Sequence, residues 1–289
     1  VHWLARTADF IELTKPRIAA LVLVTVAIAA FVAGNGLPDP WLLVHTLLGT
    51  SLVAASASAW NQLLERRTDA LMDRTSDRPL PAGRLGGRAV VWFGLAAVAL
   101  GVAYLALAVS LATAALGMAT WIAYVALYTP LKSRSSLNTA VGAVAGAMPV
   151  LMGWTAGGGR LGLEAATLFL MVFLWQFPHF MAIAWMYREQ YARAGLQMMT
   201  VVDPTGMRAG RQAVIAALAL VPVSLLPALL GIAGGAYFVW ALLLGVGQTA
   251  CAVAFWYRLD EAGARLLLRT SLVYLPSVLL SLVLDPLLL

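Results

Sequence analysis

The sequence predicts an all-α polytopic membrane protein, a bundle of about nine transmembrane helices. Of its 289 residues, 62% are hydrophobic and only 11% are charged, about half the charged fraction of an ordinary soluble domain. So little polar surface could not cover a water-soluble globule, and lipid must therefore surround most of the molecule. The composition is even along the chain, which predicts one integral-membrane domain over residues 1–289.

Runs of about 20 apolar residues are long enough to cross a bilayer as helices. We expect nine spans, at roughly 18–34, 41–61, 89–109, 112–129, 137–156, 164–186, 212–233, 237–257 and 270–289. The second span ends in Asn61 and Gln62, and the sixth contains Gln176 and His179 at membrane depth. Polar side chains are costly inside a bilayer, so a function is expected for them.

The basic residues indicate how these spans cross the membrane. If the N-terminus lies inside, all of the 19 Lys and Arg residues except Arg160 fall in inner segments. An extra or missing span would disrupt this alternation, so the bias supports the helix count and predicts a cytoplasmic N-terminus and an external C-terminus. The net charge of +6 is explained by orientation, not by nucleic-acid binding. Cys251 is the only cysteine, which excludes an internal disulfide.

An acidic pattern follows the second span. Asn61, Glu65, Asp69 and Asp73 recur every four residues, and on a helix such positions share a stripe of roughly 120°. Like charges on one face repel unless a cation lies among them. Hard oxygen ligands at this spacing suit Mg²⁺ together with substrate phosphate oxygens. The simpler interpretation is a solvated face paired with nearby arginines.

Arg74 and Arg78 directly follow the acidic pattern and complement a phosphate. Two further clusters carry candidate substrate-binding residues. The first contains Tyr128, Lys132, Arg134 and Asn138 around the fourth and fifth spans, and the second contains Gln176, His179, Arg188, Glu189 and Gln190 in and after the sixth. Each cluster also has a simpler interpretation, as positive-inside anchors or, for His179, as a packing residue.

Several stretches together resemble the UbiA-type intramembrane prenyltransferases, and within them the branch that farnesylates protoheme IX. They begin with Thr14-Lys15-Pro16-Arg17 and continue with Arg78-Pro79-Leu80-Pro81, Gly146-Ala-Met-Pro149 and Trp175-Gln-Phe-Pro178-His179. The resemblance covers nearly the whole chain. It implies a helical bundle around a central cavity, with two acidic motifs at the cytoplasmic end.

The resemblance also implies an activity. This is Mg²⁺-dependent transfer of the farnesyl group of farnesyl diphosphate to a vinyl group of heme B, with hydration, to give heme O. Asn61, Glu65, Asp69, Asp73, Tyr128 and Lys132 would be catalytic, and Glu65, Asp69, Asp73 and Glu189 would bind metal. The second acidic motif departs from the family pattern, because Gln190 stands where relatives often carry an acid. The implied setting is the bacterial inner membrane, with a heme A synthase or terminal oxidase assembly as partner.

Two alternatives remain open at this point. Another aromatic prenyltransferase of the same family, such as a 4-hydroxybenzoate polyprenyltransferase, would not hold heme. A small-molecule transporter would carry charges at the bilayer midplane and repeated halves with broken helices. Here the charges gather at one membrane face and no repeat is visible, which favours an enzyme.

Overall fold

The computed structural model describes the backbone of residues 2–34, 36 and 38–288, and the side chains of residues 6–34, 36 and 38–285. These residues form helices and no strands. The elements are α1 (His2–Leu13), α2 (Pro16–Ala33), α3 (Pro40–Asp69), α4 (Gly87–Ala108), α5 (Leu111–Ile122), the π-helical segment η1 (Ala123–Tyr128), α6 (Thr129–Leu131), α7 (Asn138–Ala156), α8 (Leu163–Met186), α9 (Arg188–Arg193), α10 (Met199–Val202), α11 (Met207–Leu229), α12 (Gly235–Arg258) and α13 (Glu261–Leu288).

Nine apolar helices among the described residues are long enough to cross a membrane, as the sequence predicted. Three of them begin or end well outside the predicted bounds. The predicted second span ended at 61, whereas α3 continues to Asp69; α11 begins at Met207 and α13 at Glu261. Hydropathy marks only the lipid-facing length of a helix, and these helices continue beyond it. The predicted end of the last span, Leu289, lies outside the described residues.

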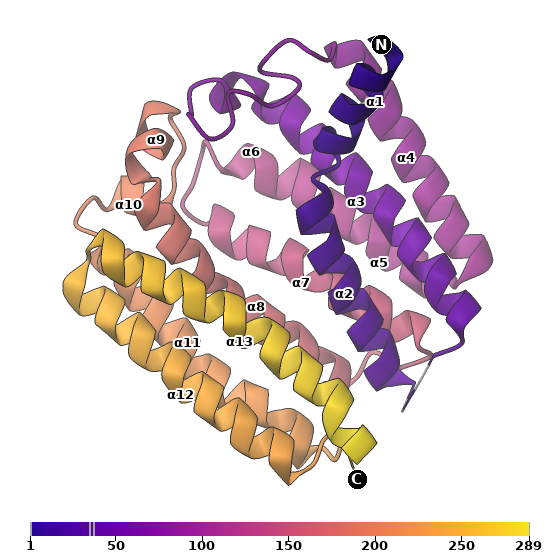
Figure 1. Cartoon of the computed structure of the whole chain (residues 1–289), viewed down its shortest axis with the longest axis vertical. Coiled ribbons are helices and arrows are strands. Elements are labelled where there is room, and N and C mark those ends of the chain that lie inside the picture. Colours follow the sequence, from indigo (N-terminus) through magenta and orange to yellow (C-terminus); the bar gives the residue numbers. More distant parts are fainter. Residues whose placement is uncertain (1, 35, 37, 289) are drawn as a thin grey trace.

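The spans form two groups that meet along the middle of the bundle (Figure 1). Helices α2, α3, α4, α5 and α7 make one group, and α8, α11, α12 and α13 make the other. Contacts of α7 with α8, and of α2 with α13, join them. Close approach of α2 to α7 depends on Gly153, because a Cβ there would lie 2.1 Å from the carbonyl oxygen of Val26.

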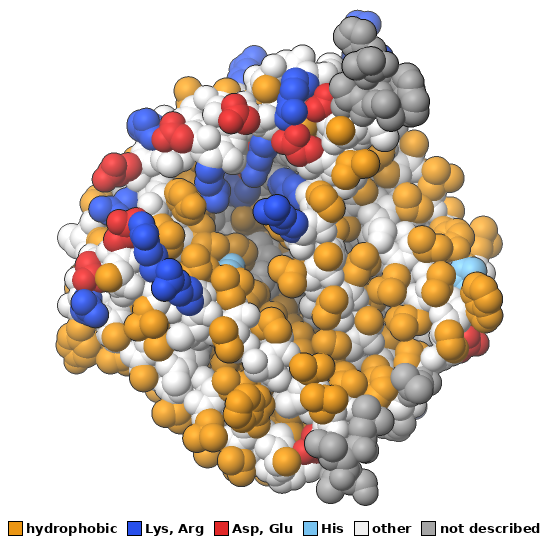
Figure 2. Space-filling view, viewed as in Figure 1, with side chains coloured by type: hydrophobic (Ala, Val, Ile, Leu, Met, Phe, Trp, Pro, Cys, Tyr) orange, Lys and Arg blue, Asp and Glu red, His pale blue; other side chains and the backbone are white. Residues whose placement is uncertain are grey.

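One end of the bundle carries the polar elements. Helices α1, α9 and α10 and the loop over residues 70–86 lie at the end where the chain begins, and the C-terminus lies at the other end (Figure 1). Lys, Arg, Asp and Glu side chains concentrate at this polar end, while apolar side chains cover most of the rest (Figure 2). Basic side chains surround the upper part of a hollow in the face shown. The hollow and its charged mouth correspond to the cavity that the resemblance implied.

Candidate functional site

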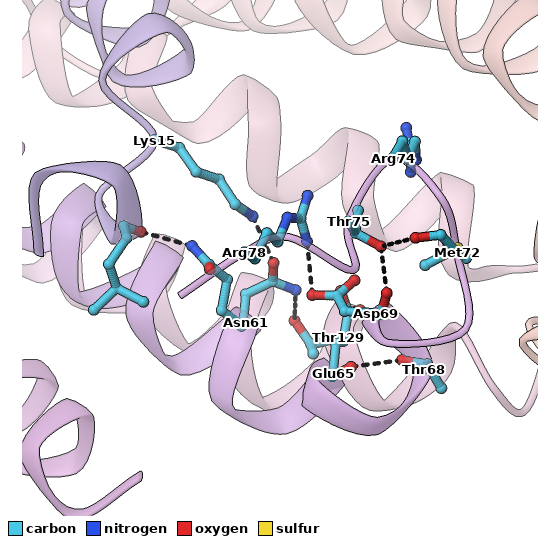
Figure 3. Close-up of polar contacts among 12 residues, drawn as sticks. Lys15, Asn61, Glu65, Thr68, Asp69, Met72, Arg74, Thr75, Arg78 and Thr129 are labelled. Carbon is cyan, nitrogen blue, oxygen red and sulfur yellow. Dashed lines mark hydrogen bonds and ion pairs between the residues drawn. The ribbon is translucent and has the colours of Figure 1, made fainter. Parts of the chain in front are cut away.

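The last turns of α3 carry the predicted acidic residues toward the polar end. Asn61, Glu65 and Asp69 are spaced by four residues, so they lie along one face of the helix (Figure 3). Asn61 and Asp69 are buried and Glu65 is half-buried. Burial of ionised carboxylates is costly unless cations accompany them.

Basic side chains from two other segments supply this compensation. Lys132, which follows α6, places Nζ 2.8 Å from Oε1 of Glu65. Arg78, in the loop over residues 70–86, places Nη1 2.7 Å from Oδ2 of Asp69. Burial lowers the pKa of Lys132, but Glu65, Tyr128 and Tyr124 together outweigh this effect and raise that pKa above its ordinary value. Lys132 is therefore a cation at neutral pH.

Lys15 joins the same site, although the sequence did not single it out as a site residue. Its Nζ donates a hydrogen bond to Oδ1 of Asn61 at 2.7 Å (Figure 3). The backbone of Lys15 is left-handed, with φ of 52°, a conformation that costs a non-glycine residue free energy and recurs at functional sites. Burial, with Arg78 and Lys132 nearby, lowers the pKa of Lys15 to about 7. The available signal was the stretch from Thr14 to Arg17, whose charges also fit a membrane anchor.

Asp73 departs from the predicted arrangement. The four-residue spacing predicted one helix from Asn61 to Asp73, but α3 ends at Asp69 and the chain turns there. The hydroxyl of Thr75 donates to the carbonyl oxygen of Asp69 at 2.7 Å and stabilises this turn. The Asp73 side chain is 77% exposed and pairs with Arg193 at 3.2 Å. The stripe on α3 therefore contains three of the four residues.

A π-helical turn shapes the wall beside Lys132. Segment η1 ends at Tyr128, whose ring lies 4.6 Å from Nζ of Lys132. The hydroxyl of Thr129 donates to the carbonyl oxygen of Tyr124 at 2.8 Å and accepts from Nδ2 of Asn61 at 3.2 Å. Such π turns are frequent at functional sites, and nothing in the sequence predicted this one.

Asn138 and Arg134 have different surroundings from those expected. Asn138 is fully buried, and its Nδ2 donates to the carbonyl oxygens of Ser135 at 2.7 Å and Gln197 at 2.9 Å. The backbone N–H of Gln197 donates to the carbonyl oxygen of Lys132 at 2.7 Å. Asn138 thus positions the loop that carries Lys132. Arg134 is exposed on that loop.

Arg74 connects the two polar loops. Its guanidinium lies 4.8 Å from the ring of Tyr187 and 5.2 Å from that of Tyr191, and Nη2 donates to the Tyr191 hydroxyl at 2.9 Å. Met72 packs in the same cluster as Tyr191. Burial is the main cause that raises the pKa of Tyr191, which keeps the hydroxyl protonated. Arg74 therefore holds the loop over residues 70–86 against α9.

The predicted second motif lies on α9. The Glu189 side chain is 85% exposed and lies 3.8 Å from Arg188. Arg188 also stacks over the Trp185 ring at 4.5 Å. Oε1 of Gln190, by contrast, is buried and has no hydrogen-bond partner in the described part of the chain. A buried polar atom without a partner is costly, so an unpaired one calls for an explanation such as a bound water or ligand.

This contrast gives a paired prediction for the second motif. Gln190→Ala is expected to lower turnover by about tenfold, whereas the exposed Glu189→Gln should stay within about twofold of wild type. Steady-state turnover of both purified variants, with equal expression as the control, measures the ranking. A crippled Glu189→Gln with a mild Gln190→Ala would instead assign the motif to Glu189.

Gln176 lies inside the bundle, where it joins α8 to α7. Its Nε2 donates to the carbonyl oxygens of Ala143 at 2.8 Å and Val172 at 3.2 Å. A Cβ at Gly146 would lie 2.2 Å from Oε1 of Gln176, so only glycine leaves room for this side chain. These contacts explain a glycine in the stretch that carries the resemblance, and they give Gln176 a packing role.

His179 lies one turn further along α8. Its Nδ1 lies 2.9 Å from the Ser271 hydroxyl of α13, and its ring stacks on Trp175 at 4.8 Å. Trp175 is itself fixed, because Nε1 donates to the carbonyl oxygen of Ser271 at 2.7 Å. No described residue hydrogen-bonds to Nε2 of His179. The ring is thus held in one orientation with one nitrogen available.

The donor set can be tested against a divalent cation. Within the described ranges, no three His, Cys, Asp or Glu side chains gather into a closed metal site. Mg²⁺ is commonly held by one or two carboxylates together with substrate phosphate oxygens and water. Glu65 and Asp69 on one face of α3 fit this smaller requirement. Asp73 and Glu189 are exposed and lie beside arginines.

The chain is similar in sequence to known proteins. The profile of the UbiA prenyltransferase family matches residues 22–273. The protoheme IX farnesyltransferase of Solibacter usitatus is 47% identical, over 96% of this chain and 98% of that protein. The protein of the same name from Rhodopirellula baltica is 42% identical, over 93% of this chain and 97% of its own length.

Solved structures show the same fold at low sequence identity. A digeranylgeranylglyceryl phosphate synthase superposes with a TM-score of 0.83 at 15% identity, covering 98% of this chain and 99% of that one. A UbiA homolog from Archaeoglobus fulgidus bound to DMAPP and Mg²⁺ superposes with a TM-score of 0.72 at 18% identity, covering 95% and 99%.

Proposed function

The chain belongs to the UbiA prenyltransferase family, and on this basis we propose that it is a protoheme IX farnesyltransferase. It transfers the farnesyl group of farnesyl diphosphate to a vinyl group of heme B and adds water, giving heme O. One observation of the site carries the proposal. At the polar end of a membrane bundle, Arg78 and Lys132 pair with the carboxylates of Asp69 and Glu65, and Lys15 hydrogen-bonds to Asn61 beside them. This charge pattern matches a diphosphate with its metal ion.

The basic residues bind the diphosphate and stabilise the charge that develops as its C–O bond to farnesyl breaks. The three basic residues come from three separate segments of the chain. Together they would therefore contact the oxygens of the diphosphate from several sides. Glu65 and Asp69 would hold Mg²⁺, which neutralises part of the diphosphate charge when bound. Arg78 and Lys132 pair with Asp69 and Glu65, and a bound diphosphate would exchange these carboxylate–cation pairs for phosphate–cation pairs.

The bundle interior completes the reaction. The allylic cation requires a site with little water, which a membrane interior supplies. The heme vinyl group forms the new C–C bond, and the positive charge then lies next to the porphyrin. Water adds there as a hydroxyl group and releases a proton, so no oxidant is consumed. The available nitrogen of His179 is suited to orient the heme acceptor through its iron.

A direct assay tests the proposal. Membranes containing the full chain are incubated with heme B, farnesyl diphosphate and Mg²⁺, and the hemes are analysed by mass spectrometry. We expect a derivative heavier by one farnesyl and one hydroxyl group. If diphosphate is released only when 4-hydroxybenzoate replaces heme B, and the purified protein shows no Soret absorbance, the chain is another aromatic prenyltransferase. Transport without diphosphate release would place it among transporters.

The proposed setting is the bacterial inner membrane with a cytoplasmic N-terminus and active-site mouth, because all basic residues but Arg160 fall on one side. A heme A synthase or terminal oxidase assembly would consume the product. We predict that alkaline phosphatase fused after Leu289 is active and that green fluorescent protein fused there is dark. A fluorescent fusion with an inactive phosphatase would contradict an external C-terminus.

A further inference from the structure

A groove between α3 and α4 lies outside the site described above. It has a volume of about 440 Å³ and is lined by Leu63, Arg66, Gly87, Arg88, Val91 and Trp92. We propose that this α3–α4 groove binds one anionic phospholipid. Arg66 and Arg88 would hold the headgroup phosphate, and the apolar side chains would hold the upper part of an acyl chain.

The charge of the groove favours an anion. Its lining includes two arginines and no acidic residue. Arg66 donates one hydrogen bond, to the carbonyl oxygen of Leu63 at 3.3 Å, and neither Arg66 nor Arg88 has an ion-pair partner in the described part of the chain. Arg78, by contrast, is paired with a carboxylate in the site. Guanidinium groups bind phosphate with paired N–H donors, so the groove presents two unused phosphate-binding groups.

The depth of the groove favours a lipid over a free phosphate ion. Arg66 lies in the last turn of α3 and Arg88 in the first turn of α4, so both are at the end of a membrane span. Trp92, one turn deeper, is 72% exposed, and exposed tryptophan is typical of the headgroup region. Leu63, Val91 and Trp92 offer apolar surface below the charges, which inorganic phosphate would not use. The combination matches a phosphate on an acyl chain.

Gly87 contributes to the shape of the groove. It lies next to Arg88 in the lining and has no side chain, and a Cβ there would meet only Cδ1 of Leu63 at 3.5 Å. A larger side chain at this position is therefore tolerated by the fold but occupies space in the groove. This provides a variant that keeps both charges and changes only the space.

Native mass spectrometry tests the proposal. The whole chain in a neutral detergent is titrated with phosphatidylglycerol or phosphatidylcholine, and the bound lipid is measured. We expect the first phosphatidylglycerol to bind in preference to phosphatidylcholine. The double variant Arg66→Gln/Arg88→Gln should bind it about tenfold more weakly. Arg67→Gln removes an exposed neighbouring charge outside the groove and is the matched control, with unchanged binding expected.

Gly87→Met should also weaken phosphatidylglycerol binding, although both arginines remain. Thermal unfolding in detergent alone checks that each variant is folded. Equal binding by wild type and the folded double variant would overturn the proposal, and so would equal affinity for the two lipids. Displacement of the lipid by millimolar inorganic phosphate alone would identify a soluble anion as the occupant and would also overturn it.

Discussion

Asp69→Asn is expected to lower farnesyl transfer by about 10²–10³-fold while the protein remains folded. Asparagine keeps the size of the side chain and one oxygen but removes the charge that faces Arg78 and that would hold the metal. The fold should tolerate the change, because Arg78 is 26% exposed and can be solvated when unpaired. The turn after α3 depends on the backbone oxygen of Asp69, which the substitution retains. Turnover of the purified variant with heme B and farnesyl diphosphate measures the effect.

Asp73→Asn is the matched control for this prediction. It removes a carboxylate of the same sequence pattern, but one that is 77% exposed and paired with Arg193. Exposed ion pairs contribute little, so turnover should stay within about twofold to threefold of wild type. Wild-type turnover in Asp69→Asn, at equal expression and thermal stability, would show that the carboxylate is structural. Equal loss in both variants would instead restore Asp73 to the active site.

Lys132→Gln is expected to abolish most activity and also to destabilise the protein. In the wild type, Nζ of Lys132 lies 2.8 Å from Oε1 of Glu65, and the side chains of Lys132 and Glu65 are only 16% and 11% exposed. Removing one partner leaves a largely buried carboxylate without its cation, which costs about 3 kcal/mol. Loss of a group that stabilises the departing diphosphate should lower turnover by about 10²-fold. Denaturant unfolding and turnover measure the two effects separately.

A double variant distinguishes the two roles of Lys132. In Lys132→Gln/Glu65→Gln the unpaired charge is gone, so most of the lost stability should return. Activity should remain low, because neither the proposed phosphate-binding cation nor the proposed metal-binding carboxylate is present. Recovery of both stability and turnover would show that the pair only supports the fold and would remove Lys132 and Glu65 from the catalytic mechanism.

The sequence by itself determined the fold class and indicated the region of the candidate site. Nine apolar segments of spanning length can be accommodated only as helices in lipid, where every backbone group needs an internal partner. The loop charges and the four-residue spacing of Asn61, Glu65 and Asp69 required no tertiary information. Both features depend on residues close together in the chain.

Only the tertiary structure decided which charges meet. Lys15, Arg78 and Lys132 reach α3 from three segments, and a long-range pairing leaves no local periodicity in the sequence. The end of α3 was equally hidden, because the turn that removes Asp73 from the stripe is held by Thr75. The π turn near Tyr128 depends likewise on packing between helices. Ion-pair partners and helix ends depend on free-energy differences that arise only when the helices pack together.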